Sequence, residues 1–411
     1  MTEDRYEIHF HHVGGYGGAL PLPIPRPLRR DVNLYLYDAN AESMDRVRTD
    51  GEYRRQMNIG QAVFDRDGQV DVHITYHPAA SSLFPVDPDA MTYWAGGYVE
   101  SDMCDILMSD FREVRRVPVP CTTIDALRRT KGIVTDFLSL DAEGSERQIL
   151  DGAHDALSTT VVGLISEVHF MNLRTGQTTA GELFDRANRH GFHMADLRMH
   201  EGRAFARLPL GWRTVGAVTS GDAFFFKRID VLKSAYPAPG PSLAKLALFC
   251  LLTGRLEHGV AAALAAQDAD PAAFNAAADF AYVKLLAEIT QLYRQQEPFF
   301  LPTWSEYYPT AEAGLRHGES GRGLDVRDAC RRYFSKVDAT KFIHRVAALS
   351  NQDDSPLESL LKRYELNELA VSVKQHRQRS LIILLNWLDL LDKEKPTTAQ
   401  HIAQRIAERL A

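Results

Sequence analysis

One stretch near the middle of this 411-residue chain constrains its fold more than any other. Residues 136–153 read Asp-Phe-Leu-Ser-Leu-Asp-Ala-Glu-Gly-Ser-Glu-Arg-Gln-Ile-Leu-Asp-Gly-Ala. Phe137 to Leu140 form a short apolar run, and a helical pattern starts at Glu146, which predicts a buried strand that turns directly into a helix. This order of elements is typical of an α/β sheet with parallel strands.

Two carboxylates, Asp141 and Glu143, lie on the predicted turn, where Gly144 lets the chain change direction. In an open parallel sheet, ligands bind beyond the carboxyl ends of the strands, because the loops diverge there and helix N-termini point outward. The position therefore predicts a functional role for both carboxylates. The structural alternative is that Glu143 and Glu146 stabilise the N-terminus of the helix.

A second set of polar residues is also predicted to lie at the end of a strand. Val161 to His169 is a strongly apolar run that predicts another buried strand, with Glu167 and His169 near its end. In a parallel arrangement, Asp141, Glu143 and Glu167 would converge on one pocket, with His169 beside them. Such carboxylates either act as a general base toward a hydroxyl group or bind a divalent cation that orients it. The sequence leaves both roles open and identifies no metal ligand.

The same region resembles the FkbM-type methyltransferases, whose members carry Lys-Ile-Asp-Val-Glu-Gly-x-Glu followed by Val-Leu-x-Gly-Ala. Ser139 to Ala153 is similar to this pattern, and Val119 to Leu127 is similar to the family's Val-x-x-Thr-Thr-Leu-Asp-x-Leu. Ile165 to Val168 resembles its Ile-x-x-Glu-Val strand. Gln61 to Val70 also resembles a family segment and stands in the same order. The resemblance extends over about residues 5–230.

This resemblance implies an α/β class I methyltransferase fold, in which a doubly wound, Rossmann-like sheet is followed here by an all-α region. It further implies S-adenosylmethionine as cofactor and O-methylation of a hydroxyl group. The acceptor would be a small molecule or glycan, either a saccharide or a polyketide-like compound. In such a transfer the enzyme mainly aligns oxygen, methyl group and sulfur, so no conspicuous nucleophile is expected in the sequence.

A glycine cluster follows the first predicted strand, Arg5 to Val13. It stands where the family has Asp-Val-Gly-Ala-Asn-x-Gly, a loop whose glycines let the backbone approach the cofactor. An acidic residue of the family is replaced here by histidine. By this resemblance, the cofactor-binding residues of the loop are His12, Gly14, Gly15, Gly17 and Gly18.

The second predicted strand, Asn33 to Tyr37, ends at Asp38, two residues before Asn40. An acidic side chain at this strand end commonly accepts hydrogen bonds from both ribose hydroxyls of a nucleotide-type cofactor. The alternative is a solvated carboxylate with no ligand. We expect Asp38 and Asn40 to contribute to cofactor binding. A polar helix is expected to follow at Ala41 to Arg55.

A proline run occupies the place of the helix that would normally connect the first two strands. Prolines alternate at positions 21, 23, 25 and 27. Repeated proline excludes a regular helix and favours an extended path. Together with His12, this departure leaves two other functions open. One is a non-catalytic binding or scaffold protein with a degenerate methyltransferase domain, and the other is a nucleotide-sugar enzyme on the same fold.

Composition limits the partners and the location. The formal net charge is −7 and no long basic run is present, which argues against nucleic acid as a partner. No apolar run approaches the length of a membrane span, and the first residues are acidic where a signal peptide would be basic. The four cysteines have neither the density of a disulfide scaffold nor zinc spacing. We expect a cytoplasmic protein.

Length predicts more than one domain, because domains typically contain about 100–200 residues. We expect the methyltransferase-like domain at residues 1–235 and a proline-rich linker at 236–242. All later patterns are helical, which predicts an all-helical domain at 243–411. This helical domain would bind a protein partner or a second copy of the chain.

Overall fold

The computed structural model describes residues 3–14, 20–48, 50–90, 111–200, 217–296, 339–351, 353–394 and 404. By its internal contacts the chain divides into two compact units, Met1–Thr290 and Gln291–Ala411. The first unit contains the sheet and the candidate site. The second unit contains only helices among its described residues.

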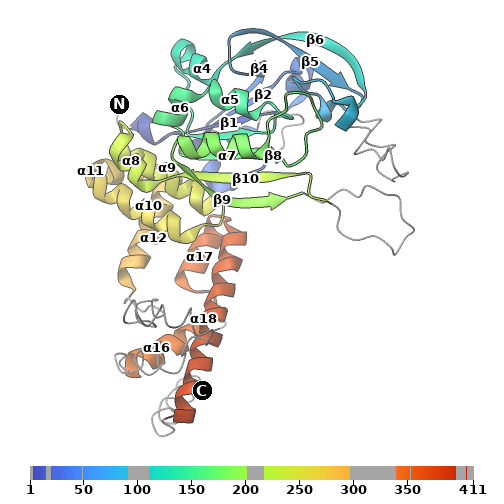
Figure 1. Ribbon diagram of the computed structural model, residues 1–411. Coiled ribbons are helices and arrows are strands. Elements are labelled where there is room, and N and C mark those ends of the chain that lie inside the picture. The colour runs from blue at the N-terminus through green and yellow to red at the C-terminus, as the bar shows by residue number, and fades with distance from the viewer. Residues whose placement is uncertain are drawn as a thin grey trace. The chain divides into compact units, whose positions relative to one another are not determined.

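A seven-stranded sheet forms the centre of the first unit (Figure 1). In spatial order its strands are β3 (Arg55–Gly60), β2 (Val32–Asp38), β1 (Ile8–Val13), β7 (Phe137–Leu140), β8 (Gly163–His169), β10 (Ser220–Lys227) and β9 (Phe192–Met199). All neighbours are parallel except the two pairs that β10 makes with β8 and β9. The strand order reverses between β1 and β7, which is where such sheets bind ligands. The predicted doubly wound α/β fold is confirmed.

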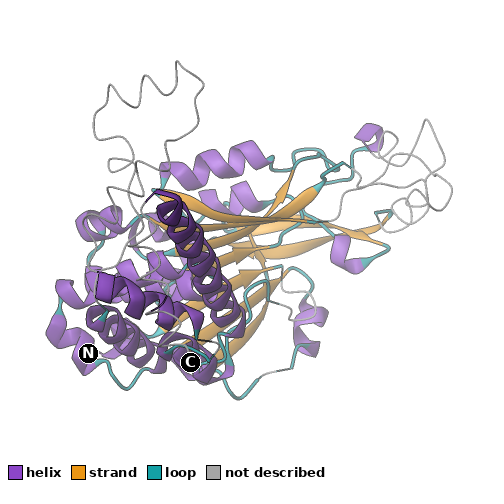
Figure 2. Ribbon diagram, turned by 90° about the horizontal axis from the view of Figure 1, so that it is seen from below, coloured by secondary structure: helices purple, strands orange, loops and turns teal. Residues whose placement is uncertain are grey.

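Helices cover both sides of this sheet (Figure 2). On one side, Leu138 and Leu140 of β7 pack in a common core with Ile149, Leu157 and Leu183. Leu138 and Leu140 reach this core together because side chains two apart on a strand share a face, and the other three residues come from three helices. The helices on this side are α4 (Ile124–Lys131), α5 (Glu146–Asp151), α6 (His154–Thr159) and α7 (Ala180–Arg189).

On the other side, Phe137 of β7 meets Phe249, with 5.2 Å between the ring centroids. Phe249 also lies against Gly163 of β8, where an added Cβ would come within 2.2 Å of the ring. A larger residue than glycine would therefore displace the helix that carries Phe249. That helix, α9 (Pro239–Leu252), lies in a group with α8 (Ile229–Ala235), α10 (Leu256–Ala269), α11 (Pro271–Ala276) and α12 (Ala281–Gln295).

The compact unit extends beyond the boundary that the sequence suggests. The expected linker at 236–242 does not separate two units, because α9 begins inside it and the first unit runs to Thr290. Nearly every residue of α9 from Leu243 to Leu251 is buried, so this helix is apolar all round and must be enclosed by other elements. A proline-rich composition indicated a linker, but the buried helix that follows it belongs to the sheet unit.

A buried ion pair connects α9 to the sheet. Lys245 Nζ donates to both carboxylate oxygens of Asp136, each at 2.9 Å, and the His9 amide donates to the same carboxylate at 2.8 Å. Tyr282 of α12 donates its hydroxyl to the Tyr6 carbonyl at 2.9 Å. The helices after β10 are thus bonded to the N-terminal segment and to the start of β7.

The described part of the segment between β1 and β2 contains no α-helix, as the proline run predicted, although Pro27 lies in a 3₁₀ helix. Residues 20–25 form no helix, and the 3₁₀ helix η3 (Arg26–Asp31) leads into β2. The helix expected at Ala41 to Arg55 is wrong in its second half. It ends early, as α1 (Ala41–Arg46), and β3 begins at Arg55. Met57 and Ile59 both pack on the core. Their spacing of two residues is that of a strand, which forms here because the segment pairs with β2.

A small second sheet stands beside the large one. Its order is β4-β6-β5, formed by β4 (Ala62–Val63), β6 (Glu113–Thr122) and β5 (Gly68–Thr75). β5 pairs antiparallel with β6, and β4 pairs parallel with β6. The short 3₁₀ helix η4 (Pro78–Ala80) follows β5.

The second unit is described as three helices, α16 (Ala339–Ser350), α17 (Pro356–Arg363) and α18 (Asn367–Glu394). Arg377 of α18 donates to the buried carboxylate of Glu358 in α17 at 2.9 Å. The expected helical character holds for these residues. Among the helices that the structure describes, none is both long and apolar enough to span a membrane.

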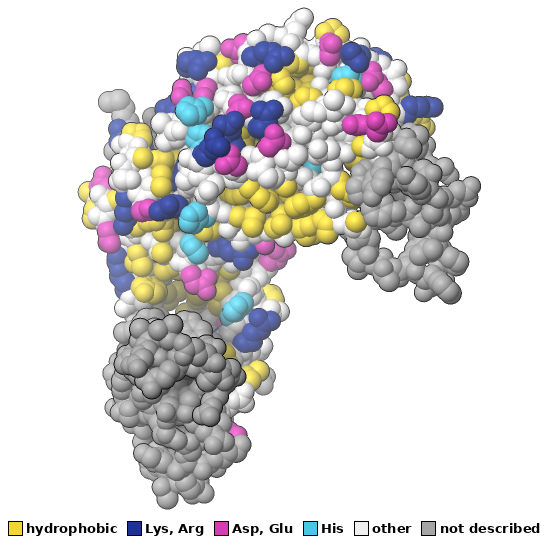
Figure 3. All heavy atoms as spheres, viewed as in Figure 1, with side chains coloured by type: hydrophobic (Ala, Val, Ile, Leu, Met, Phe, Trp, Pro, Cys, Tyr) yellow, Lys and Arg dark blue, Asp and Glu magenta, His cyan; other side chains and the backbone are white. Residues whose placement is uncertain are grey.

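Charged and apolar side chains occupy different regions of the surface of the first unit (Figure 3). Charges of both signs are interspersed over the side covered by α4 to α7. Apolar side chains gather near β9, the last strand of the sheet, where Met194 and Met199 are exposed.

Lys245→Ala is expected to lower the free energy of unfolding by about 3–5 kcal/mol, because it leaves the buried Asp136 carboxylate without its cation. Lys284 of α12 is exposed and provides a matched control. Lys284→Ala should change the same quantity by less than about 0.5 kcal/mol. Urea unfolding followed by circular dichroism measures both. Equally small effects would mean that α9 lies outside the cooperative unit.

Candidate functional site

A cavity lies beyond the carboxyl ends of β1, β2 and β7, at the point where the strand order reverses. Its lining brings together five residues that the sequence singled out. They are Gly14, Asp38, Asn40, Asp141 and Glu143. The other walls come from the β3–β4 connection and from the segment around η4.

Gly14 follows β1 and lies against the backbone of Asp141, which follows β7. Its φ is +94°, and an added Cβ would lie 1.6 Å from the Asp141 carbonyl oxygen. The Gly14 amide donates to the Tyr37 carbonyl, and the Asp141 amide donates to the Val13 carbonyl, both at 2.9 Å. Only glycine fits this position. Three other predicted loop residues, Gly15, Gly17 and Gly18, lie outside the described residues.

Asp38 ends β2 at the cavity wall. The Asn40 amide donates to its Oδ1 at 2.7 Å, which fixes the side chain. Within the described part of the chain this is the carboxylate's one hydrogen bond, so Oδ2 is available to a ligand. Burial raises the pKa of Asp38, although the Asn40 amide opposes this effect.

His12 does not line this cavity. Its Nδ1 lies 3.0 Å from the Ser139 hydroxyl, inside the sheet, and the side chain is buried. Burial lowers the pKa of His12 to about 4, so the ring is neutral at pH 7. Successive strand residues point to opposite faces, and it is the next residue, Val13, that reaches the cavity. Among the described cofactor candidates, Gly14, Asp38 and Asn40 line the cavity and His12 does not.

Glu143 is held by Arg174, which the sequence analysis missed. Arg174 Nη2 donates to Glu143 Oε2 at 2.5 Å, and its Nε donates to the Glu143 carbonyl at 3.0 Å. The Ser82 hydroxyl donates to the same carbonyl at 2.8 Å. Glu143 has a φ of +53°, unusual for a residue with a side chain, and these bonds stabilise it. No sequence pattern marks Arg174, because it follows β8 in a loop and is buried only in the folded chain.

Asp141 lines the cavity, where the residue is exposed to solvent although many protein atoms surround its carboxylate. Burial, followed by the charges of Glu167 and Glu143, raises the pKa of Asp141 to about 8. The same two causes, burial and neighbouring carboxylates, raise the pKa of Glu167 well above its usual range. The three carboxylates that the sequence predicted to converge are therefore close enough to influence one another.

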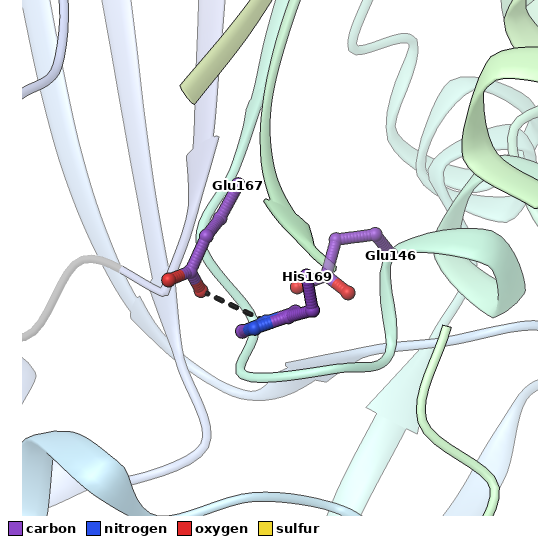
Figure 4. Close-up of side chains that lie close together, drawn as sticks. All are labelled: Glu146, Glu167 and His169. Atoms are coloured by element: carbon purple, nitrogen blue, oxygen red, sulfur yellow. Dashed lines mark ion pairs between the residues drawn. The ribbon is translucent and has the colours of Figure 1, made fainter. Parts of the chain in front are cut away.

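Glu146, Glu167 and His169 form a compact group beside these carboxylates (Figure 4). His169 Nε2 lies 3.2 Å from Glu167 Oε2, and both come from β8. Glu146 is completely buried, and its Oε1 accepts hydrogen bonds from the Ala142 and Gly144 amides, each at 3.1 Å. Glu146 therefore stabilises the turn before its helix, as the structural alternative expected.

Residues 50–194 match the family model described as Methyltransferase FkbM domain. The resemblance seen in the sequence is confirmed for this part of the chain, which runs from the start of β3 into β9. The matched part includes Asp141 and Glu167. It begins after β1, the glycine cluster and Asp38, which therefore lie outside it. Comparisons with curated proteins and with solved structures found no match. The domain supports methyltransferase activity and, in general, a cofactor of the S-adenosylmethionine type.

Gly14→Ala is expected to destabilise the fold by more than about 2 kcal/mol, because the new Cβ would overlap the Asp141 carbonyl at a φ that disfavours side chains. Gly51→Ala is the matched control, since an added Cβ there meets nothing within 4 Å. Thermal unfolding by calorimetry compares the two. A Gly14→Ala variant as stable as Gly51→Ala would show that β1 and β7 do not approach so closely.

Proposed function

We propose that this chain is an S-adenosylmethionine-dependent O-methyltransferase that acts on a hydroxyl group of a saccharide or a polyketide-like small molecule. The FkbM domain supports the methyltransferase class. The observation on which the finer proposal depends is that Gly14, Asp38 and Asp141, from three different strand ends, line one cavity at the switch point of the sheet.

The cavity has features that suit this cofactor. Asp38 offers a carboxylate oxygen to ribose hydroxyls, and Ala62 and Val63 add apolar surface for a flat ring. Asp141 lines the same cavity, and its ionised form, present above its pKa of about 8, suits a positively charged sulfonium. The bound cofactor would supply a methyl group attached to a good leaving group. In this proposal, Asn40 contributes by fixing the Asp38 side chain through its backbone amide.

The chain's own residues then orient the acceptor and remove its proton. Asp141, which lines the cavity, accepts the proton of an acceptor hydroxyl in its ionised form, so transfer is expected to rise with pH through its pKa of about 8. Glu143 lines the same cavity, and its bonds to Arg174 keep the turn in one conformation. Correct alignment accounts for most of the rate of such a transfer, so a rigid turn is an advantage.

The second candidate, a scaffold protein that has lost the cofactor, has one observation in its favour. His12 replaces the family's acidic residue and is turned into the core, so this strand end provides no charged contact. The two candidates differ in a property that is simple to measure, which is the affinity for S-adenosylmethionine.

Asp38→Ala should weaken S-adenosylmethionine binding by about 10–100-fold, because hydrogen bonds to a charged group contribute about 1.5–3 kcal/mol. Isothermal titration calorimetry measures this affinity without any acceptor. Asp71→Ala removes an exposed carboxylate of β5 and should leave the affinity unchanged. A folded Asp38→Ala variant that binds like the wild type would disprove the assignment of the cavity. An absence of binding by the wild type would favour the scaffold.

Asp141→Asn should keep the fold and the cofactor affinity while methyl transfer falls by about 10²–10⁴-fold, the usual contribution of a positioned base. Glu143→Gln should instead lower stability, because Arg174 loses its charged partner. Transfer of a labelled methyl group to a panel of saccharides and polyketide lactones measures the first effect, and thermal unfolding the second. Full transfer by Asp141→Asn would exclude Asp141 as the base.

A further inference from the structure

We propose that Glu146, Glu167 and His169 bind one divalent transition-metal ion beside the cavity. One ligand atom from each residue lies within 4.8 Å of the others. Glu146 Oε2, Glu167 Oε2 and His169 Nε2 are all buried, and none has a hydrogen-bond partner. Glu167 Oε2 and His169 Nε2 form an ion pair with each other at 3.2 Å, so Glu146 Oε2 is the one atom of the three with neither a hydrogen bond nor an ion pair among the described residues. Three buried atoms that could coordinate a metal thus belong to one compact group of residues.

Such atoms are unusual inside a protein, since a buried polar atom without a partner costs free energy. Glu146 is completely buried, and only 8% of His169 is exposed. Oε1 of Glu146 is fixed by the Ala142 and Gly144 amides, which leaves Oε2 as its free atom. Figure 4 shows this carboxylate beside the His169 ring, with Glu167 on the other side of the ring.

The charges around the group also favour a cation. Glu143 and Asp222 add two carboxylates that act on Glu167, and Arg174 is the cation that opposes them. Arg174 is already paired with Glu143 at 2.5 Å. Asp222 has only the His200 ring, at 3.2 Å, as its ion-pair partner within the described residues. A divalent ion would compensate the remaining negative charge.

The donor set indicates which class of ion fits. Two carboxylate oxygens and one imidazole nitrogen suit Mn²⁺ or Zn²⁺ better than Mg²⁺ or Ca²⁺, which prefer oxygen ligands only. The 3.2 Å between His169 Nε2 and Glu167 Oε2 fits two ligands that each lie about 2.0–2.2 Å from one ion. Glu167, with 13% of its side chain exposed, leaves a route by which an ion can enter.

Three protein ligands leave further coordination positions open, as in catalytic metal sites. Glu167 is also the charge that acts most strongly on Asp141. An ion held by Glu167 would therefore lie near the proposed base and would orient the acceptor oxygen. This role rests on the proposed methyltransferase function, whereas metal binding itself does not.

The test is a metal titration of the full chain after treatment with EDTA and dialysis, with neither cofactor nor acceptor present. Free Mn²⁺ is followed by electron paramagnetic resonance, and Zn²⁺ is then added as competitor. We expect one equivalent of Mn²⁺ to bind and Zn²⁺ to displace it. Glu146→Gln and His169→Gln should each weaken binding by more than about 100-fold, beyond the roughly 10–100-fold typical of losing an outer-shell partner.

His200→Gln is the matched control, because His200 also lies 3.2 Å from a carboxylate, that of Asp222, but belongs to no group of three ligands among the residues that the structure describes. It should bind Mn²⁺ like the wild type. Glu146→Gln keeps an oxygen for the turn amides, and circular dichroism checks its fold. If it does not fold, His169→Gln decides alone.

Two outcomes would overturn the inference. One is the lack of a single Mn²⁺ or Zn²⁺ equivalent in the wild type, and the other is equal binding by the wild type and the folded ligand variants. Either could occur in a protein that binds S-adenosylmethionine normally, so failure of the metal site is distinguishable from failure of the proposed function. Metal binding that depends on His169 and Glu146 would support the site even without measurable methyl transfer.

Discussion

The structure depends on the close approach of two parallel strands at their carboxyl ends. The Asp141 amide donates to the Val13 carbonyl at 2.9 Å, and Gly14 has no Cβ to hold the chains apart. Because β1 and β7 flank the switch point, this contact places the acidic turn directly beside the start of the first loop. Asp38, one strand further on, then lines the same cavity.

Two buried charged groups hold the acidic turn in its conformation. Glu146 accepts two backbone hydrogen bonds from inside the turn, and Arg174 donates to the carbonyl and carboxylate of Glu143 from outside. The turn is therefore supported before any ligand binds, which suits a site whose main task is alignment. The same support leaves Glu146 Oε2 free beside His169.

The sequence predicted features that depend on local pattern and failed where distant contacts decide. Apolar runs and turn residues were sufficient to predict the strand β7, the acidic turn after it and the position of Asp38 at the end of a strand. His12 was predicted from the resemblance of its loop to a cofactor loop, which does not show that strand alternation turns its ring toward Ser139. The boundary at 236–242 could not be recognised as internal, since α9 is enclosed by elements far away in sequence. Arg174 has its role only through contacts with the acidic turn.

The central claim is that one cavity, bounded by Gly14, Asp38 and Asp141, binds the cofactor. A crystal structure of the chain with S-adenosylhomocysteine tests it most directly. We expect ribose hydroxyls within hydrogen-bond distance of Asp38 and the sulfur on the side of Asp141. Ligand density at another place, with this cavity closed, would contradict it.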